Sequence, residues 1–190
     1  MSATAALTGG LVDPPLDAAH AFRAIMNVMA RPGEIRTLDQ GRPPQPVSVA
    51  TGTVLLTLCD PDTGVFLAGQ CDTSEMRDWL AFHTGAPVVS PQEAQFALGA
   101  WADLLPLDQF SVGVPEYPDR SATLIVECSD LRSEGVRLQG PGIRDTAQLS
   151  LPETEAFAAN HRLYPLGLDF MFTAGSKVAA LPRSTAILEG

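Results

Sequence analysis

Short apolar runs that alternate with helix-start signals are the feature of this sequence that most limits its possible folds. Residues 65–68 read as a buried strand, and Asp72 and Glu75 follow as the cap and capping-box partner of a helix. Residues 87–89 form another apolar stretch, and residues 90–93 then give a second helix start with Pro91 at its first position. Repeated strand-then-helix units predict an α/β fold with a mixed sheet flanked by helices.

Further elements are expected from the same periodicities. Ala19, Ile25 and Met29 recur at helical spacing and predict a first helix, which Asp17 can cap and residues 31–33 end. The clearest central strand covers residues 122–128. The other expected elements are helices over 51–59, 101–110 (broken by a proline) and 153–162, and strands over 34–38, 95–98, 136–139, 169–173, 178–181 and 185–188.

Length and apolar content predict one domain. A chain of 190 residues with 45% hydrophobic residues can build one substantial core. We expect this domain over residues 16–190 and a flexible N-terminal arm over residues 1–15, which are mostly small and end in Pro14-Pro15. No apolar stretch approaches the roughly 20 residues that span a bilayer, so no membrane association is expected.

The N-terminus and the cysteines bear on location. The first residues lack the basic start, apolar run and cleavage site of a signal peptide. Cys59, Cys71 and Cys128 are odd in number and lack CxxC spacing, which favours reduced thiols. Both observations predict a cytoplasmic protein.

Charge excludes one class of partner. The sequence has 22 Asp and Glu against 12 Lys and Arg, a formal charge of −10. No basic run offers the patch that supplies most nucleic-acid affinity, so no nucleic-acid partner is expected.

Lys177, the one lysine in the sequence, raises the question of pyridoxal phosphate chemistry, which needs a lysine for its internal aldimine. It follows Gly175-Ser176 between two apolar strands, where small and polar residues make a hairpin turn. The turn is the favoured interpretation, and no cofactor is expected.

Other catalytic arrangements are weakly supported. His20, His83 and His161 lie far apart without metal-ligand spacing, so no metal site is expected. A GxSxG nucleophile elbow is absent from the sequence. Cys71 precedes a predicted helix start and is the only thiolate candidate by position, although a buried thiol is the favoured interpretation.

Two loops concentrate unusual residues. Residues 113–121 contain Tyr117, Asp119, Arg120 and Ser121 beside the predicted central strand, where α/β folds often bind ligands. The alternative is that Arg120 pairs with a neighbouring acid, Asp119 or Glu116, and only fixes a turn.

The second loop, Gly140-Pro141-Gly142, could bring backbone N–H groups to an anion or could form an ordinary turn. Arg31 and Arg183 are further donors for a phosphate or carboxylate, though pairing with an acid of the chain is the commoner use.

Read together, five segments resemble the PhnH family, a subunit of the bacterial carbon-phosphorus lyase complex. In order, they are FRAIMNVMARPG at 22–33, YPDRSAT at 117–123, LQGPGI at 138–143, YPLGLD at 164–169 and LPRST at 181–185. The resemblance implies a homodimer whose fold resembles the large domain of pyridoxal-phosphate-dependent transferases without the coenzyme.

The resemblance further implies work with PhnG, PhnI and PhnJ subunits. PhnI exchanges the adenine of ATP for a phosphonate at ribose C1, giving a ribose 1-phosphonate 5-triphosphate, and PhnJ later cleaves the carbon-phosphorus bond. The first hypothesis is therefore an accessory subunit without catalysis of its own, in which Arg31, Arg120 and Arg183 hold local structure or a phosphorylated ligand. The alternative is a stand-alone small-molecule enzyme of the transferase-like fold.

Overall fold

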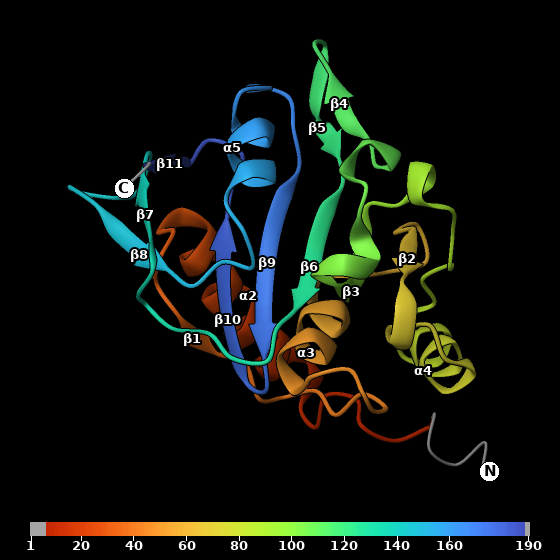
Figure 1. Cartoon of the computed structure of the whole chain (residues 1–190). Coiled ribbons are helices and arrows are strands. Elements are labelled where there is room, and N and C mark those ends of the chain that lie inside the picture. The colour runs from red at the N-terminus through yellow and green to blue at the C-terminus, as the bar shows by residue number, and fades with distance from the viewer. Residues whose placement is uncertain (1–6, 189–190) are drawn as a thin grey trace.

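A mixed six-stranded sheet forms the centre of the computed structural model, which describes residues 7–188 (Figure 1). Strands β2 (Val65–Leu67), β3 (Phe96–Ala100), β6 (Thr123–Glu127) and β9 (Asp169–Ala174) run parallel. Strand β10 (Lys177–Leu181) pairs antiparallel with β9, and β1 (Arg36–Thr37) pairs antiparallel with β10. The order of the strands in the sheet is β1-β10-β9-β6-β3-β2. The predicted α/β class with a mixed sheet is confirmed.

Helices cover one face of the sheet. These are α2 (Pro14–Ala30), α3 (Val49–Leu58) and α4 (Ser74–Thr84), and the apolar side chains that they bury share one cluster with Leu98 and Ile125. Within residues 7–188, the structure has no helix that combines the length and the apolar character of a membrane span.

The other face carries smaller elements. They are α5 (Glu155–His161), the three-stranded sheet β11 (Ala186–Leu188), β7 (Val136–Gln139) and β8 (Ala147–Leu149), and the hairpin of β4 (Val112–Val114) and β5 (Tyr117–Ser121). A second core cluster lies under them and includes Leu124 and Val126, whereas Ile125 belongs to the first. This alternation along β6 is the period of two expected of a strand covered on both faces.

Two predicted helix starts are wrong in detail. Helix α2 begins at Pro14, inside the range expected to be an arm, and the Asp17 carboxylate instead accepts hydrogen bonds from the backbone N–H groups of Val12 and Asp13. Thr73 caps α4, because its hydroxyl accepts the Met76 N–H at 3.1 Å.

Part of the predicted arm is held against α4, because Trp79 Nε1 of α4 donates to the carbonyl of Thr8 at 3.0 Å. Residues 1–6 of the predicted arm lie outside the described residues.

Three further elements differ from expectation. The start signal at Ser90 gives only a 3-10 turn, Pro91–Glu93, because the chain enters β3 directly afterwards. The helix expected over residues 101–110 is two 3-10 turns, Trp101–Leu104 and Leu107–Gln109. The polar loop expected over residues 113–121 is largely the β4–β5 hairpin.

Candidate functional site

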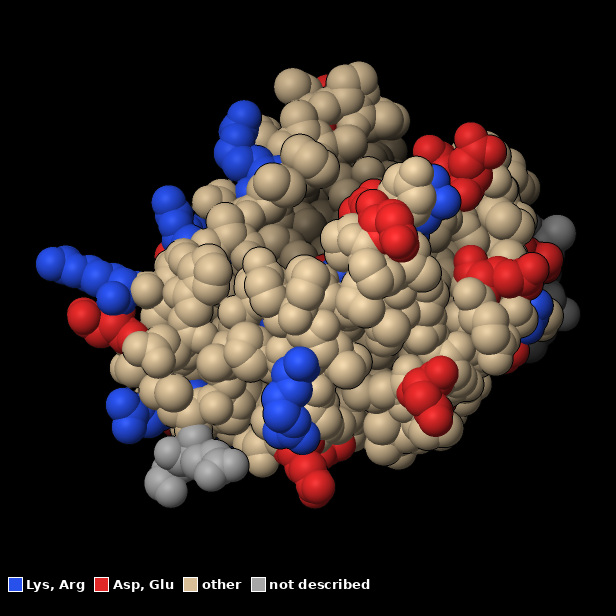
Figure 2. Space-filling model, turned by 90° about the horizontal axis from the view of Figure 1, so that it is seen from above, with Lys and Arg blue, Asp and Glu red and all other residues tan. Residues whose placement is uncertain are grey.

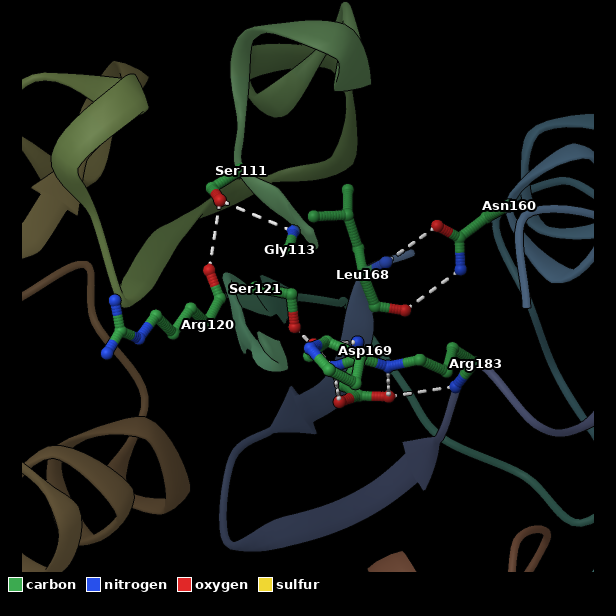
Figure 3. A network of polar contacts seen from close by, with 9 residues as sticks. Ser111, Gly113, Arg120, Ser121, Asn160, Leu168, Asp169 and Arg183 are labelled. Carbon is green, nitrogen blue, oxygen red and sulfur yellow. Dashed lines mark hydrogen bonds and ion pairs between the residues drawn. The ribbon is translucent and has the colours of Figure 1, made fainter. Parts of the chain in front are cut away.

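Arg183 is the centre of a polar network that joins three distant parts of the chain (Figure 3). Its backbone N–H and its Nε both donate to Asp169 Oδ1, at 2.8 and 3.2 Å, and Nη2 reaches Asp169 Oδ2 at 2.5 Å. Nη1 donates to the carbonyl of Pro118 at 2.7 Å, and Nη2 also donates to the Ser121 hydroxyl. The two charged side chains are only 13% and 17% exposed, so this is a largely buried ion pair.

The elements around this pair explain how it forms. Asp169 is the first residue of β9, next to β6, and Arg183 follows the end of β10. Asn160 of α5 holds the residue before Asp169, because its side chain accepts the N–H of Leu168 at 2.7 Å and donates to its carbonyl at 2.9 Å. All three guanidinium nitrogens of Arg183 therefore donate to groups of this chain, and the side chain serves to hold β5 against the end of the sheet.

Arg120 lies on the same strand as Ser121 but points away from this network (Figure 3). Its guanidinium carbon sits 4.1 Å from the centre of the Tyr117 ring, a cation-π contact. Neither Asp119 nor Glu116 is among the partners in the ion pairs of the described residues. The structure thus shows Arg120 stacked on Tyr117 rather than paired with an acid.

Arg120 lines a cavity of about 780 Å³ at the amino ends of β2, β3 and β6. Polar groups dominate its wall, which includes Ser111, Asp119, Arg120, Ser121, Thr123, Gln92, Gln95, Asp62 and Glu93. The guanidinium can donate to a phosphate or carboxylate oxygen, while the three acids favour a ligand that also carries donors. Asp119, Arg120 and Ser121, three of the candidate residues, all line this cavity.

Arg31 does not join the other candidates. Its Nη1 lies 4.0 Å from Glu34 Oε1 and 3.5 Å from Asn27 Oδ1, both near neighbours in sequence. The Gly140-Pro141-Gly142 turn packs on the end of α2 instead of opening to an anion. A Cβ on Gly142 would lie 1.8 Å from the carbonyl oxygen of Ala30, so only glycine permits this approach.

Sequence reasoning missed a second crevice, of about 700 Å³, at the carboxyl ends of the parallel strands. Glu127, Asp103, Cys71 and Cys128 contribute to its wall. The signal that could have found it is the general preference of open α/β sheets for ligands at the carboxyl ends of strands.

Glu127 is anchored in this crevice by the start of α3, because its Oε1 accepts the backbone N–H of Ser48 at 2.8 Å. Burial raises the pKa of Glu127, and the hydrogen bonds from Ser48 and Thr51 oppose this rise. In a capping box, an acidic residue of the helix's own first turn accepts the backbone N–H of the N-cap residue. Helix α3 has no acidic residue there, and the Glu127 carboxylate accepts the N–H of its N-cap residue, Ser48, instead.

The thiols are protonated at neutral pH. Burial raises the pKa of Cys59 and Cys71 to about 12 and that of Cys128 to about 11, and nearby carboxylates add to the effect. Cys71, the thiolate candidate by position, therefore lacks the electropositive surroundings that activate a nucleophilic cysteine. No group of three or more His, Cys, Asp or Glu residues in the described part of the chain is arranged to hold a metal ion.

Lys177 lies at the hairpin between β9 and β10, as the sequence predicted. Its Nζ pairs with Asp130 Oδ1 at 3.0 Å and donates to the carbonyl of Leu131 at 3.2 Å. These two contacts fasten the loop after β6 to the hairpin, and the lysine side chain itself stays about half exposed.

The chain is similar to one family of known proteins and to two named relatives. A family model described as bacterial phosphonate metabolism protein (PhnH) matches residues 9–188. The chain is 40% identical over 189 residues to the Rhizobium meliloti (strain 1021) protein named alpha-D-ribose 1-methylphosphonate 5-triphosphate synthase subunit PhnH, covering 95% of this chain and 94% of that protein. It is 30% identical over 174 residues to the putative C-P lyase subunit protein HtxG of Stutzerimonas stutzeri, covering 88% and 84%.

Proposed function

Because the chain belongs to the PhnH family of bacterial phosphonate metabolism proteins, we propose that it is an accessory subunit of a carbon-phosphorus lyase assembly. In this assembly it supports the exchange of the adenine of ATP for a phosphonate at ribose C1. The observation that carries the proposal is the 40% identity to a named synthase subunit along 95% of the chain. The family model spans residues 9–188, a range that includes every element that builds the Arg183 network.

The proposed partners are PhnG, PhnI and PhnJ subunits, with a homodimer as the state of the isolated chain, in the cytoplasm. We propose that residues 16–190 act as one domain in this assembly. The formal charge of −10 favours partner faces that are basic. In Figure 2 the acidic residues gather on the side of β2 and α4, and the basic ones on the side of the three-stranded sheet. Assembly through the acidic side should weaken as salt is added.

Within the subunit, the arginines take different roles. Arg31 and Arg183 hold local structure, since both contact acids of this chain. Arg120, stacked on Tyr117, is the candidate that holds an anionic group, and Asp119 and Ser121 supply further polar contacts from the same cavity wall. This geometry suits a phosphate or carboxylate on a molecule that also offers hydrogen-bond donors.

The alternative is a stand-alone small-molecule enzyme of the transferase-like fold, either pyridoxal-dependent or hydrolytic. A pyridoxal-dependent enzyme would need Lys177 as its aldimine lysine. Lys177 is engaged with Asp130 and Leu131, which favours the accessory role without coenzyme. Adding pyridoxal phosphate to the purified chain tests the alternative, because an imine absorbance band that Lys177→Ala abolishes would support it.

Co-expression with PhnG, PhnI and PhnJ subunits tests the main proposal. The chain should co-purify with them, and the assembly should release adenine from ATP only when this subunit is present. Arg120→Gln should slow that release while the assembly stays intact, whereas Arg144→Gln, which does not line the Arg120 cavity, should not. Turnover by the isolated chain, or full activity of the assembly without it, would contradict the proposal.

A further inference from the structure

An apolar groove of about 650 Å³ lies between α5 and the turns that precede β4. It is separate from both cavities described above. Its wall is mostly apolar and includes Leu105, Asp108, Phe110, Leu163 and Leu168. Figure 2 views the end of the molecule that carries α5 and the β4–β5 hairpin, and shows a recess surrounded mostly by uncharged residues.

The groove has a buried base and exposed rims. Phe110 and Leu168 are 3% and 1% exposed, whereas Leu105 and Leu163 are 41% and 49% exposed. Tyr164, the residue after Leu163, is 61% exposed. Large apolar side chains gathered around a concave surface mark an interaction site more often than scattered ones do.

One charged residue belongs to the groove. Asp108 is exposed and forms no ion pair or hydrogen bond with any part of the chain from residue 7 to residue 188. Arg162, next to Leu163 in sequence, lines a different pocket, between α5 and β7. The apolar wall and the unpaired carboxylate together define what a complementary surface must offer.

We propose that this groove docks an apolar segment of another subunit of the assembly, with a Lys or Arg placed beside its apolar side chains to face Asp108. The inference rests on the proposed accessory role. A second copy of this chain fits less well, because a two-fold contact brings the same patch of both copies together, and the groove wall contains no Lys or Arg that could face Asp108. A different chain can supply that basic residue.

The test is co-purification of the tagged full-length chain with PhnG, PhnI and PhnJ subunits. Leu163→Asp puts a charge into the groove and should reduce the recovered partners at least tenfold. Met26→Asp is the matched control, because Met26 is 52% exposed on α2 and does not line the groove. Asp108→Lys should weaken recovery, whereas Asp145→Lys, at an exposed position between β7 and β8, should not. Circular dichroism melting of each variant checks that the fold is kept.

The outcomes separate the two proposals. If the wild type recovers no partner, the accessory role fails and this inference fails with it. If the wild type and Leu163→Asp recover partners equally, only the groove assignment is overturned. If Leu163→Asp makes a dimeric chain monomeric in sedimentation while partner recovery is unchanged, the groove is a contact between copies and the proposal is also overturned.

Discussion

The carboxylate of Asp169 holds Arg183 by both its backbone and its side chain, since Oδ1 accepts from the Arg183 backbone N–H at 2.8 Å and from Nε at 3.2 Å. This double contact fixes the chain after β10 against the first residue of β9. Ser121 and the carbonyl of Pro118 complete the arrangement from the hairpin.

Removing Arg183 should therefore destabilise the fold strongly. Arg183→Ala leaves the Asp169 carboxylate, 17% exposed, without its partner, and we expect a loss of about 3–5 kcal/mol in the free energy of unfolding. Urea denaturation measures it. Arg77→Ala, which breaks the exposed pair with Asp72, is the control and should cost less than about 1 kcal/mol. Equal costs for the two variants would contradict the structural role of Arg183.

Glu127 should make stability depend on pH. Its pKa is raised in the folded state, so the folded protein holds this proton more tightly than the unfolded chain does. Its contribution is most favourable below the ordinary glutamate pKa of about 4.3, and it is lost as pH rises through the folded pKa.

Glu127→Gln keeps an oxygen for the Ser48 N–H and removes the titration. The stability of the variant relative to wild type should therefore increase as the pH is raised from 4 to 7, and thermal melts at several pH values measure this difference. A difference that stays constant over this range would refute the assignment.

The thiols should react slowly. The pKa of Cys128 is raised to about 11, against about 8.5 for a free cysteine, and the lower thiolate fraction is only partly offset by higher nucleophilicity. Alkylation at pH 8 should be roughly 20-fold or more slower than that of glutathione. Mass spectrometry measures the rate of alkylation of the native protein, and the urea-unfolded chain serves as the control. Rapid native modification at Cys71 would show an activated thiolate.

Two glycines with positive φ should respond differently to substitution. Gly142→Ala places a Cβ against the Ala30 carbonyl, whereas Gly175→Ala meets no atom within 4 Å. We expect Gly175→Ala to cost about 1–2 kcal/mol from its left-handed backbone alone. Gly142→Ala should cost at least about 2 kcal/mol more, because backbone must move. Chemical denaturation of both proteins compares them, and equal losses would mean that the GPG turn can shift freely.

The sequence predicted the sheet better than its surroundings. Residues 122–128 were expected as a central strand, and β6 is central, because its side chains alternate between two cores. Tyr117–Ser121 was expected as a loop, since its polar residues and proline lack strand alternation, yet it pairs with β4. The signal at Ser90 was overridden by the short distance to β3.

The sequence predicts only some of the geometry around the candidate residues. Asp119, Arg120 and Ser121 are candidates because they stand together in one polar segment before the central strand, and the structure places all three in one cavity wall. The partnership of Ser121 with Arg183 spans 62 residues and depends on how β5 meets the end of the sheet, which local patterns do not encode. Asp169 ends the YPLGLD segment and begins a predicted strand, but neither pattern predicts that it pairs with Arg183.

The two crevices lie at opposite ends of one strand. Thr123 borders the cavity of Arg120, and Glu127 borders the crevice that Cys71 and Cys128 also line. Four residue steps of a parallel strand separate them, about 13 Å. A small molecule bound in one crevice is therefore out of contact with the other, and any coupling between the two crevices must pass through the parallel strands β2, β3 and β6 that connect them.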